Sequence, residues 1–166
     1  ISMLRRLEMG IDDMARVVGL AHSLGIHAIV TVFSVELVQV AEKLAWDAYK
    51  TASPDIVHRP LLEELARTGK PLIVSTGAAE LSEVARATEW LGAARTRDRL
   101  ALMQCVSSYP TPASLAELGG IAAIQGTTDV PVGYSDHTSS ERMGRWAVLA
   151  GACLLEKHMT YDRAAA

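Results

Sequence analysis

The chain has 166 residues, of which 49% are hydrophobic, and it carries a formal net charge of -3. This length suffices for one domain with a sizeable core, and the mild acidity indicates no nucleic-acid or membrane surface. No apolar run reaches the roughly 18 residues of a membrane span, and no basic segment followed by an apolar one suggests secretion. Cys105 and Cys153 match no metal or redox motif, so we expect free thiols and a cytoplasmic protein.

One pattern recurs along the chain: a short apolar run, a polar loop and an amphipathic helix. Apolar residues at helical spacing predict helices over residues 11–24, 60–69 and 81–91. The tetrapeptide TSSE at 138–141 has the spacing of a capping box. It predicts a further helix that begins there and contains Met143.

The intervening apolar runs predict six strands, at residues 27–32, 47–52, 71–76, 100–105, 130–135 and 153–158. Most are apolar at consecutive positions, which is typical of strands buried on both faces in a parallel sheet covered by helices. Six strand–helix units indicate an α/β fold, either a doubly wound sheet or part of a (β/α)8 TIM barrel. No Gly-rich phosphate loop follows the first strand, and this favours the barrel.

All six predicted strands end in polar residues. Parallel α/β folds place their sites at the carboxyl ends of the strands, so these residues are the candidates for a functional site. In chain order they are Thr31 and Ser34; Lys50, Ser53 and Asp55; Ser75 and Thr76; Gln104, Ser107 and Tyr109; Ser135, Asp136 and His137; and Glu156, Lys157 and His158.

His137 and His158 end two consecutive predicted strands. Neighbouring strands lie about 4.8 Å apart, so both imidazoles could reach one divalent ion that polarises a substrate oxygen. The alternative is that each histidine is a hydrogen-bonded residue of the core or rim. His22, His27 and His58 have no such pairing, and we expect them to be structural or exposed.

Short hydroxyl groups and one ammonium could converge on a phosphate or carboxylate. The candidates are Thr31, Lys50, Ser53, Ser75, Ser107 and Ser135. The alternative for the hydroxyls is turn and helix-cap chemistry. A lysine inside a buried strand must have a partner, and for Lys50 a Schiff-base role is the rival interpretation.

Asp55 and Tyr109 are candidates for proton transfer. The alternative is that Asp55 is an ordinary loop carboxylate and that Tyr109 is a half-buried ring. The segment PTP at 110–112 would fix the position of the phenol, because proline restricts the backbone. Asp136 either accepts a hydrogen bond from His137 or caps the turn.

Six motifs occur in order along essentially the whole chain: TVFS (31–34), AYKTAS (48–53), KPLIVSTG (70–77), QCVSSYPTP (104–112), VGYSDHT (132–138) and LLEKHMTYDR (154–163). In these motifs the chain resembles the N-acetylneuraminate (sialic acid) synthase family. The resemblance implies a (β/α)8 barrel that condenses phosphoenolpyruvate with an N-acyl amino sugar, such as N-acetylmannosamine, and releases phosphate. Precursors of legionaminic or pseudaminic type remain open as substrates.

The resemblance also implies roles for the candidate residues. His137 and His158 would bind a divalent ion, typically manganese, and the hydroxyl residues with Lys50 would bind phosphoenolpyruvate. Asp55 would handle protons, Tyr109 would face the sugar, and Lys50 would act as an anion clamp rather than as a Schiff base. Pro54 departs from the glycine that is usual in the family.

By this resemblance, residues 1–166 form a partial barrel covering the family's strands three to eight. We expect a fragment that lacks the first two strands and the C-terminal antifreeze-like domain, that is inactive alone, and whose parent is a homodimer. A Schiff-base aldolase of the same barrel class and a non-catalytic sugar- or phosphate-binding relative are the alternatives.

Overall fold

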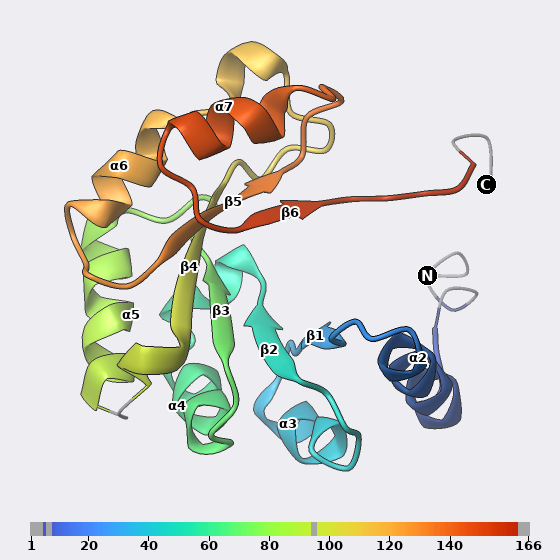
Figure 1. Ribbon diagram of the computed structural model, residues 1–166. Coiled ribbons are helices and arrows are strands. Elements are labelled where there is room, and N and C mark those ends of the chain that lie inside the picture. The colour runs from blue at the N-terminus through green and yellow to red at the C-terminus, as the bar shows by residue number, and fades with distance from the viewer. Residues whose placement is uncertain (1–4, 6–7, 94–95, 163–166) are drawn as a thin grey trace.

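The computed structural model describes residue 5, residues 8–93 and residues 96–162 (Figure 1). Six parallel strands form one sheet in which each strand lies beside the one that precedes it in the chain. The strands are β1 (Ile29–Thr31), β2 (Ala48–Thr51), β3 (Leu72–Ser75), β4 (Leu100–Cys105), β5 (Val132–Asp136) and β6 (Leu155–Lys157). A doubly wound sheet would reverse its strand order, so the unbroken order confirms the barrel.

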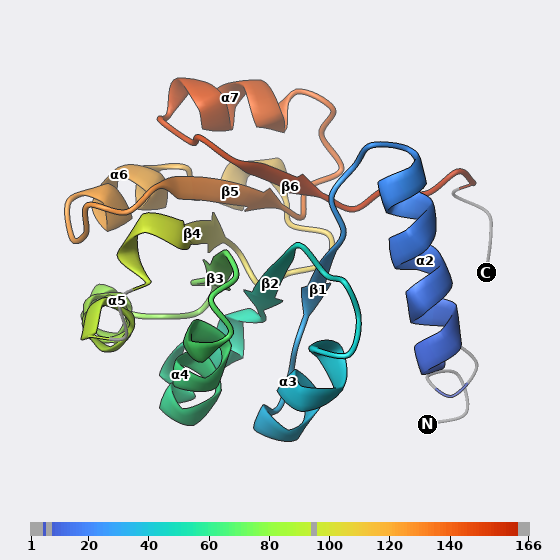
Figure 2. The same cartoon turned by 60° about the horizontal axis from the view of Figure 1, so that its bottom comes forward.

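Helices connect the strands and cover the outside of the sheet. The connecting helices are α3 (Val35–Ala41), α4 (Arg59–Arg67), α5 (Leu81–Ala93), α6 (Gly119–Gln125) and α7 (Met143–Leu149), and α2 (Ile11–Ser23) precedes β1. Figure 2 shows the strands following an arc with α3 to α7 outside it, which confirms a partial (β/α)8 barrel. In the described part of the chain, no helix combines the length and the apolarity needed to cross a membrane.

The core lies between the sheet and this outer layer of helices. Tyr49 of β2, Leu102 of β4 and Tyr134 of β5 are almost fully buried there, together with Leu61 and Leu65 of α4. The Tyr134 hydroxyl donates a hydrogen bond to the carbonyl of Ala116 at 3.0 Å, so this ring is buried with its polar atom satisfied. Burial of these large side chains supplies the main driving force for packing the helices onto the sheet.

The sheet curls far enough for its two ends to face each other across an interior. Lys50 Nζ on β2 lies 3.5 Å from Glu156 Oε2 on β6, although three strands separate β2 from β6 in the sheet. Between them is a cavity of about 440 Å³, with Thr31, Ile73 and Met103 in its wall. The concave side of the sheet is therefore the inside of a half-barrel.

The prediction that the strands are buried on both faces is confirmed for β2 to β5, and it is wrong for the two outer strands, β1 and β6. Ile29 of β1 and Leu155 of β6 are 48% and 52% exposed. Each of these strands pairs with a single neighbour among the described residues, so it has less cover than an inner strand.

The predicted capping box at 138–141 is also wrong, because α7 begins only at Met143. The Thr138 hydroxyl accepts a hydrogen bond from the Ser140 backbone N–H at 3.2 Å instead of capping a helix. The Thr138 backbone is held by Asp136 and Lys157, which keeps this segment in a turn.

A carboxylate ties the amino ends of the strands to α2. Asp47, just before β2, lies 2.8 Å from His22 Nε2 and 3.4 Å from His27 Nδ1, and it accepts the Ala28 backbone N–H at 2.7 Å. His22 and His27 are therefore structural surface residues, as expected. The Ala28 hydrogen bond, followed by the contact with His22, lowers the pKa of Asp47 to about 2.

We predict that Asp47 stabilises the fold in a pH-dependent way. Its folded-state pKa lies below the ordinary value of 3.8, so the stabilisation is complete above about pH 4 and is lost as the pH falls toward 2. Thermal unfolding of the intact protein and of Asp47→Asn should therefore differ at pH 6 and converge near pH 2. A difference that is constant over this range would contradict the assignment.

Candidate active site

Four predicted residues face the interior of the half-barrel because the strands are in register. Thr31 pairs with Lys50 across β1 and β2, and Ser135 of β5 pairs with both Cys105 and Glu156. Paired residues in a parallel sheet point to the same face, and side chains alternate along each strand. Ser75 belongs to this face through its pairing with Met103, which lines the interior cavity. Its hydroxyl is buried without a hydrogen-bond partner among the described residues.

Two further predicted serines meet in the loops beyond the strands. A Cβ atom placed on Gly77 would lie 2.6 Å from Ser107 Oγ, 2.7 Å from Ser53 Oγ and 2.8 Å from Cys105 Sγ. Ser53 Oγ and Cys105 Sγ are themselves 3.2 Å apart. The loops after β2, β3 and β4 therefore converge on one point, and this approach requires glycine at position 77.

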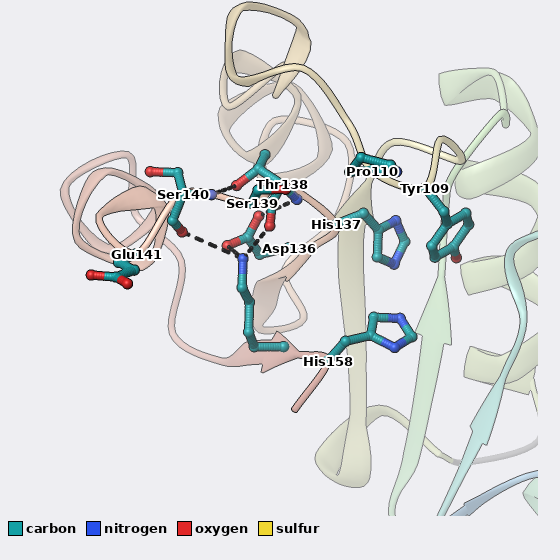
Figure 3. Close-up of a pocket in the computed structure, with 10 residues that line it drawn as sticks. Tyr109, Pro110, Asp136, His137, Thr138, Ser139, Ser140, Glu141 and His158 are labelled. Atoms are coloured by element: carbon teal, nitrogen blue, oxygen red, sulfur yellow. Dashed lines mark hydrogen bonds and ion pairs between the residues drawn. The ribbon is translucent and has the colours of Figure 1, made fainter. Parts of the chain in front are cut away.

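The two predicted histidines lie side by side at the rim (Figure 3). The ring centroids of His137 and His158 are 5.6 Å apart, and the Tyr109 ring lies 4.0 Å from the first and 5.8 Å from the second. These three rings share a cavity of about 390 Å³ with the turn after β5. The structure thus brings Tyr109, His137 and His158 together.

The hydrogen bonds of His137 determine which of its nitrogens is free. Nδ1 lies 2.7 Å from the carbonyl oxygen of Val106, which can only accept, so Nδ1 carries the proton. Nε2 then carries the lone pair of the ring, and it accepts a hydrogen bond from the Ser135 hydroxyl at 3.3 Å. This is the arrangement by which a backbone acceptor orients a metal-binding imidazole.

The donor set at the rim fits a divalent transition metal with open coordination positions. His137 and His158 offer two imidazoles, a ligand type that suits such ions. Within residues 8–93 and 96–162 no group of three or more His, Cys, Asp or Glu side chains is placed to hold a metal. Two protein ligands would leave the other positions for substrate and water.

Asp136 does not orient His137; that possibility is wrong, and the capping alternative is confirmed. Its Oδ1 accepts the Thr138 backbone N–H at 2.8 Å, and its Oδ2 binds Lys157 Nζ at 2.5 Å. The reason is strand alternation, which turns Asp136 away from the side occupied by His137.

Lys50 has the partner that its burial requires. This partner is Glu156, one of the polar strand-end residues, for which the sequence predicted no specific role. Glu156 Oε2 is buried and makes no hydrogen bond within the described residues, but it lies 3.5 Å from Lys50 Nζ. Its position at a polar strand end was the available signal. The contact itself could not be read from the sequence, because it crosses the interior between distant strands.

Asp55 and Gln104 lie away from the imidazoles. Asp55 is half-buried in a 3₁₀ helix (Ser53–Val57) after β2, and burial raises the pKa of its carboxyl group. Gln104 faces the helices, where its Nε2 donates to the Glu117 carbonyl at 3.2 Å. Burial and then the charges of Cys105 and Glu156 raise the pKa of Tyr109, so its phenol is a hydrogen-bond donor at neutral pH.

Comparison with known proteins gives consistent matches over the whole chain. The family model described as NeuB family matches residues 1–166. The chain is 36% identical over 161 residues to an uncharacterized protein of Methanocaldococcus jannaschii. It is 31% identical over 166 residues to the N,N'-diacetyllegionaminic acid synthase of Campylobacter jejuni. These alignments cover 97% and 98% of this chain but 48% and 49% of the relatives, so the chain spans about half their length.

The fold has a matching solved structure. The N-acetylneuraminic acid (sialic acid) synthetase of Leptospira borgpetersenii superposes with a TM-score of 0.88 at 31% sequence identity. The match covers 94% of this chain and 54% of that chain.

We predict that Gly77→Ala disrupts the meeting point of the three loops. Its Cβ would clash with Ser53, Cys105 and Ser107, and such overpacking costs about 1–3 kcal/mol of unfolding free energy. Denaturant unfolding of the intact protein measures this loss. Gly19→Ala is the control, because the exposed Gly19 in α2 has no atom within 4 Å of an added Cβ. It should stabilise the helix by about 0.5–1 kcal/mol.

Proposed function

The chain belongs to the NeuB family, and we propose that the intact protein condenses phosphoenolpyruvate with an N-acyl amino sugar to a sialic-type acid and releases phosphate. The legionaminic acid synthase among its relatives supports sugar-acid synthesis at the level of the family. The proposal therefore names a class of products and leaves the sugar open. The free Cys105 and Cys153 are consistent with the proposed cytoplasmic location.

The proposal rests on one observation above all. Two imidazoles with ring centroids 5.6 Å apart lie at the same end of the half-barrel as a lysine and several hydroxyl groups. The imidazoles suit a metal ion that binds a carbonyl oxygen, and the lysine with the hydroxyl groups suits an anion. A reaction between an aldehyde sugar and a phosphorylated carboxylic acid needs both.

The interior face would bind phosphoenolpyruvate. Lys50 offers an ammonium. The Ser75 hydroxyl, which has no hydrogen-bond partner among the described residues, and the Ser135 hydroxyl offer neutral donors on the same face. Ser53 and Ser107 add two hydroxyls where their loops meet at Gly77. Thr31 lies beside Lys50 in the sheet register. Glu156 would keep the Lys50 ammonium in place before the anion arrives.

The rim would bind the sugar through a divalent ion, for which we propose manganese. His137 and His158 would hold it, and when bound it polarises the aldehyde oxygen of the sugar. The Val106 carbonyl keeps the His137 Nε2 lone pair free for this role. Tyr109, against both rings, would donate a hydrogen bond to the sugar. Asp55 lies two residues after Ser53, and burial raises the pKa of its carboxyl group. It would exchange a proton near the phosphate of the bound phosphoenolpyruvate.

The pairing of Lys50 favours this chemistry over a Schiff-base aldolase. A Schiff base requires a free amine, whereas a lysine facing a carboxylate at 3.5 Å is placed as an ammonium. Lys50 is therefore proposed as an anion clamp.

We predict that His137→Ala lowers phosphate release by about 10²-fold or more, because a group that supports developing negative charge is lost. The assay measures phosphate from phosphoenolpyruvate with N-acetylmannosamine and related sugars, with and without Mn²⁺, using the intact protein. His27→Ala is the matched control, since His27 is exposed at the opposite end of the strands. Absence of phosphate release with every N-acyl hexosamine would count against the proposal.

We predict that Lys50→Met raises KM for phosphoenolpyruvate by about tenfold to a hundredfold, the value of one charged hydrogen bond. Steady-state kinetics at saturating sugar measures this change. Treatment with pyruvate and borohydride should leave Lys50 unmodified by mass spectrometry. A covalent adduct on Lys50 would instead establish the Schiff-base reaction.

A further inference from the structure

An ion pair occupies the last rung of the ladder between β5 and β6. Asp136 and Lys157 are register partners, and Lys157 Nζ lies 2.5 Å from Asp136 Oδ2. The carboxylate side chain is only 5% exposed, whereas the lysine side chain is 43% exposed. Separating the pair would leave this buried carboxylate without a counter-charge, which is energetically costly. The ion pair therefore joins the two strand ends firmly.

The two imidazoles follow this pair directly in the chain. His137 comes after Asp136, and His158 comes after Lys157. Figure 3 shows Asp136 on one side of the strand ends and both rings on the other side, toward Tyr109. The separation of the rings therefore depends on how the preceding residues are joined.

His137 and His158 are held to very different degrees. His137 is fixed to the loop after β4, because its Nδ1 binds the Val106 carbonyl and its own carbonyl accepts the Thr111 N–H at 2.9 Å. The His158 ring makes no hydrogen bond or ion pair within the described part of the chain, and it lies beyond the last residue of β6. The residue before it, Lys157, is held by its ion pair with Asp136.

Lys157 also fastens the turn that follows His137. Its ammonium donates to the Thr138 carbonyl at 2.5 Å and to the Ser140 carbonyl at 3.4 Å. Asp136 Oδ1 accepts the Thr138 N–H in the same turn. Lys157, the last residue of β6 and the one before His158, thus connects this strand with the turn that follows His137.

We propose that Asp136 and Lys157 are positioning residues that set the spacing of the His137 and His158 rings and thereby the affinity of the rim for a divalent ion. This inference rests on the proposed metal site. It adds two residues that line the same cavity as the two imidazoles and for which the proposed reaction had given no role.

The test uses Asp136→Asn in the intact protein. The asparagine oxygen can still accept the Thr138 N–H, and the partly exposed Lys157 can turn to water, so the change removes mainly the ion pair. We expect Mn²⁺ affinity to fall by about 10- to 100-fold, as for other residues that orient metal ligands. The measurement is the electron paramagnetic resonance signal of free Mn²⁺ during titration. Thermal unfolding shows that each variant is folded at the temperature used.

Two controls separate positioning from general destabilisation. Asp47→Asn makes the same chemical change at the opposite end of the strands, so it should lower stability and leave Mn²⁺ affinity unchanged. Lys157→Met should weaken Mn²⁺ binding as Asp136→Asn does. The double variant should bind Mn²⁺ about as weakly as the more affected of the two single variants, because both changes break the same ion pair. Lys157→Arg, which keeps the charge, should bind more tightly than Lys157→Met.

The outcomes distinguish this inference from the proposed function. If the unaltered protein binds Mn²⁺, His137→Ala does not, and Asp136→Asn binds as the unaltered protein does, the positioning role is overturned and the proposed function stands. If the unaltered protein itself binds no Mn²⁺, both are overturned. Additive losses in the double variant would also contradict a shared role for the pair.

Discussion

The structure depends on the register of six parallel strands in a curled sheet. Register decides which side chains share a face, and the curl decides that one of these faces is an interior. Lys50 and Ser135 lie on different strands, yet they face the same enclosed space because each is in register with its neighbours. The polar groups at the strand ends form a site because this arrangement directs them to one end of the half-barrel.

The site has two parts with different physical support. The interior part is built on the strands, where Ser75 and Ser135 are buried and held by the ladder. The rim part is built on loops, so its side chains need fixing by further contacts. His137 obtains them from the Val106 carbonyl and His158 through the neighbouring Lys157. Side chains next to the imidazoles in the chain therefore contribute to the proposed geometry of the rim.

Much of the fold was predictable, because apolar periodicity reports burial directly. The six strands, the helix ends near Gly25 and Gly69, and the barrel class all agree with the structure. The start of α7 was not predictable from the TSSE spacing. The Thr138 backbone is held by Asp136 and Lys157, and a contact with another strand overrides a local helix signal.

The sequence by itself determined the residue types at each strand end and the alternation that separates Asp136 from His137. Only the tertiary structure decided which of these groups meet. Lys50 faces Glu156, and Ser53 approaches Cys105 at Gly77, through contacts between residues far apart in the chain. The physical reason is that periodicity along a strand gives the direction of a side chain, whereas the curl of the sheet and the path of the loops determine what lies in that direction.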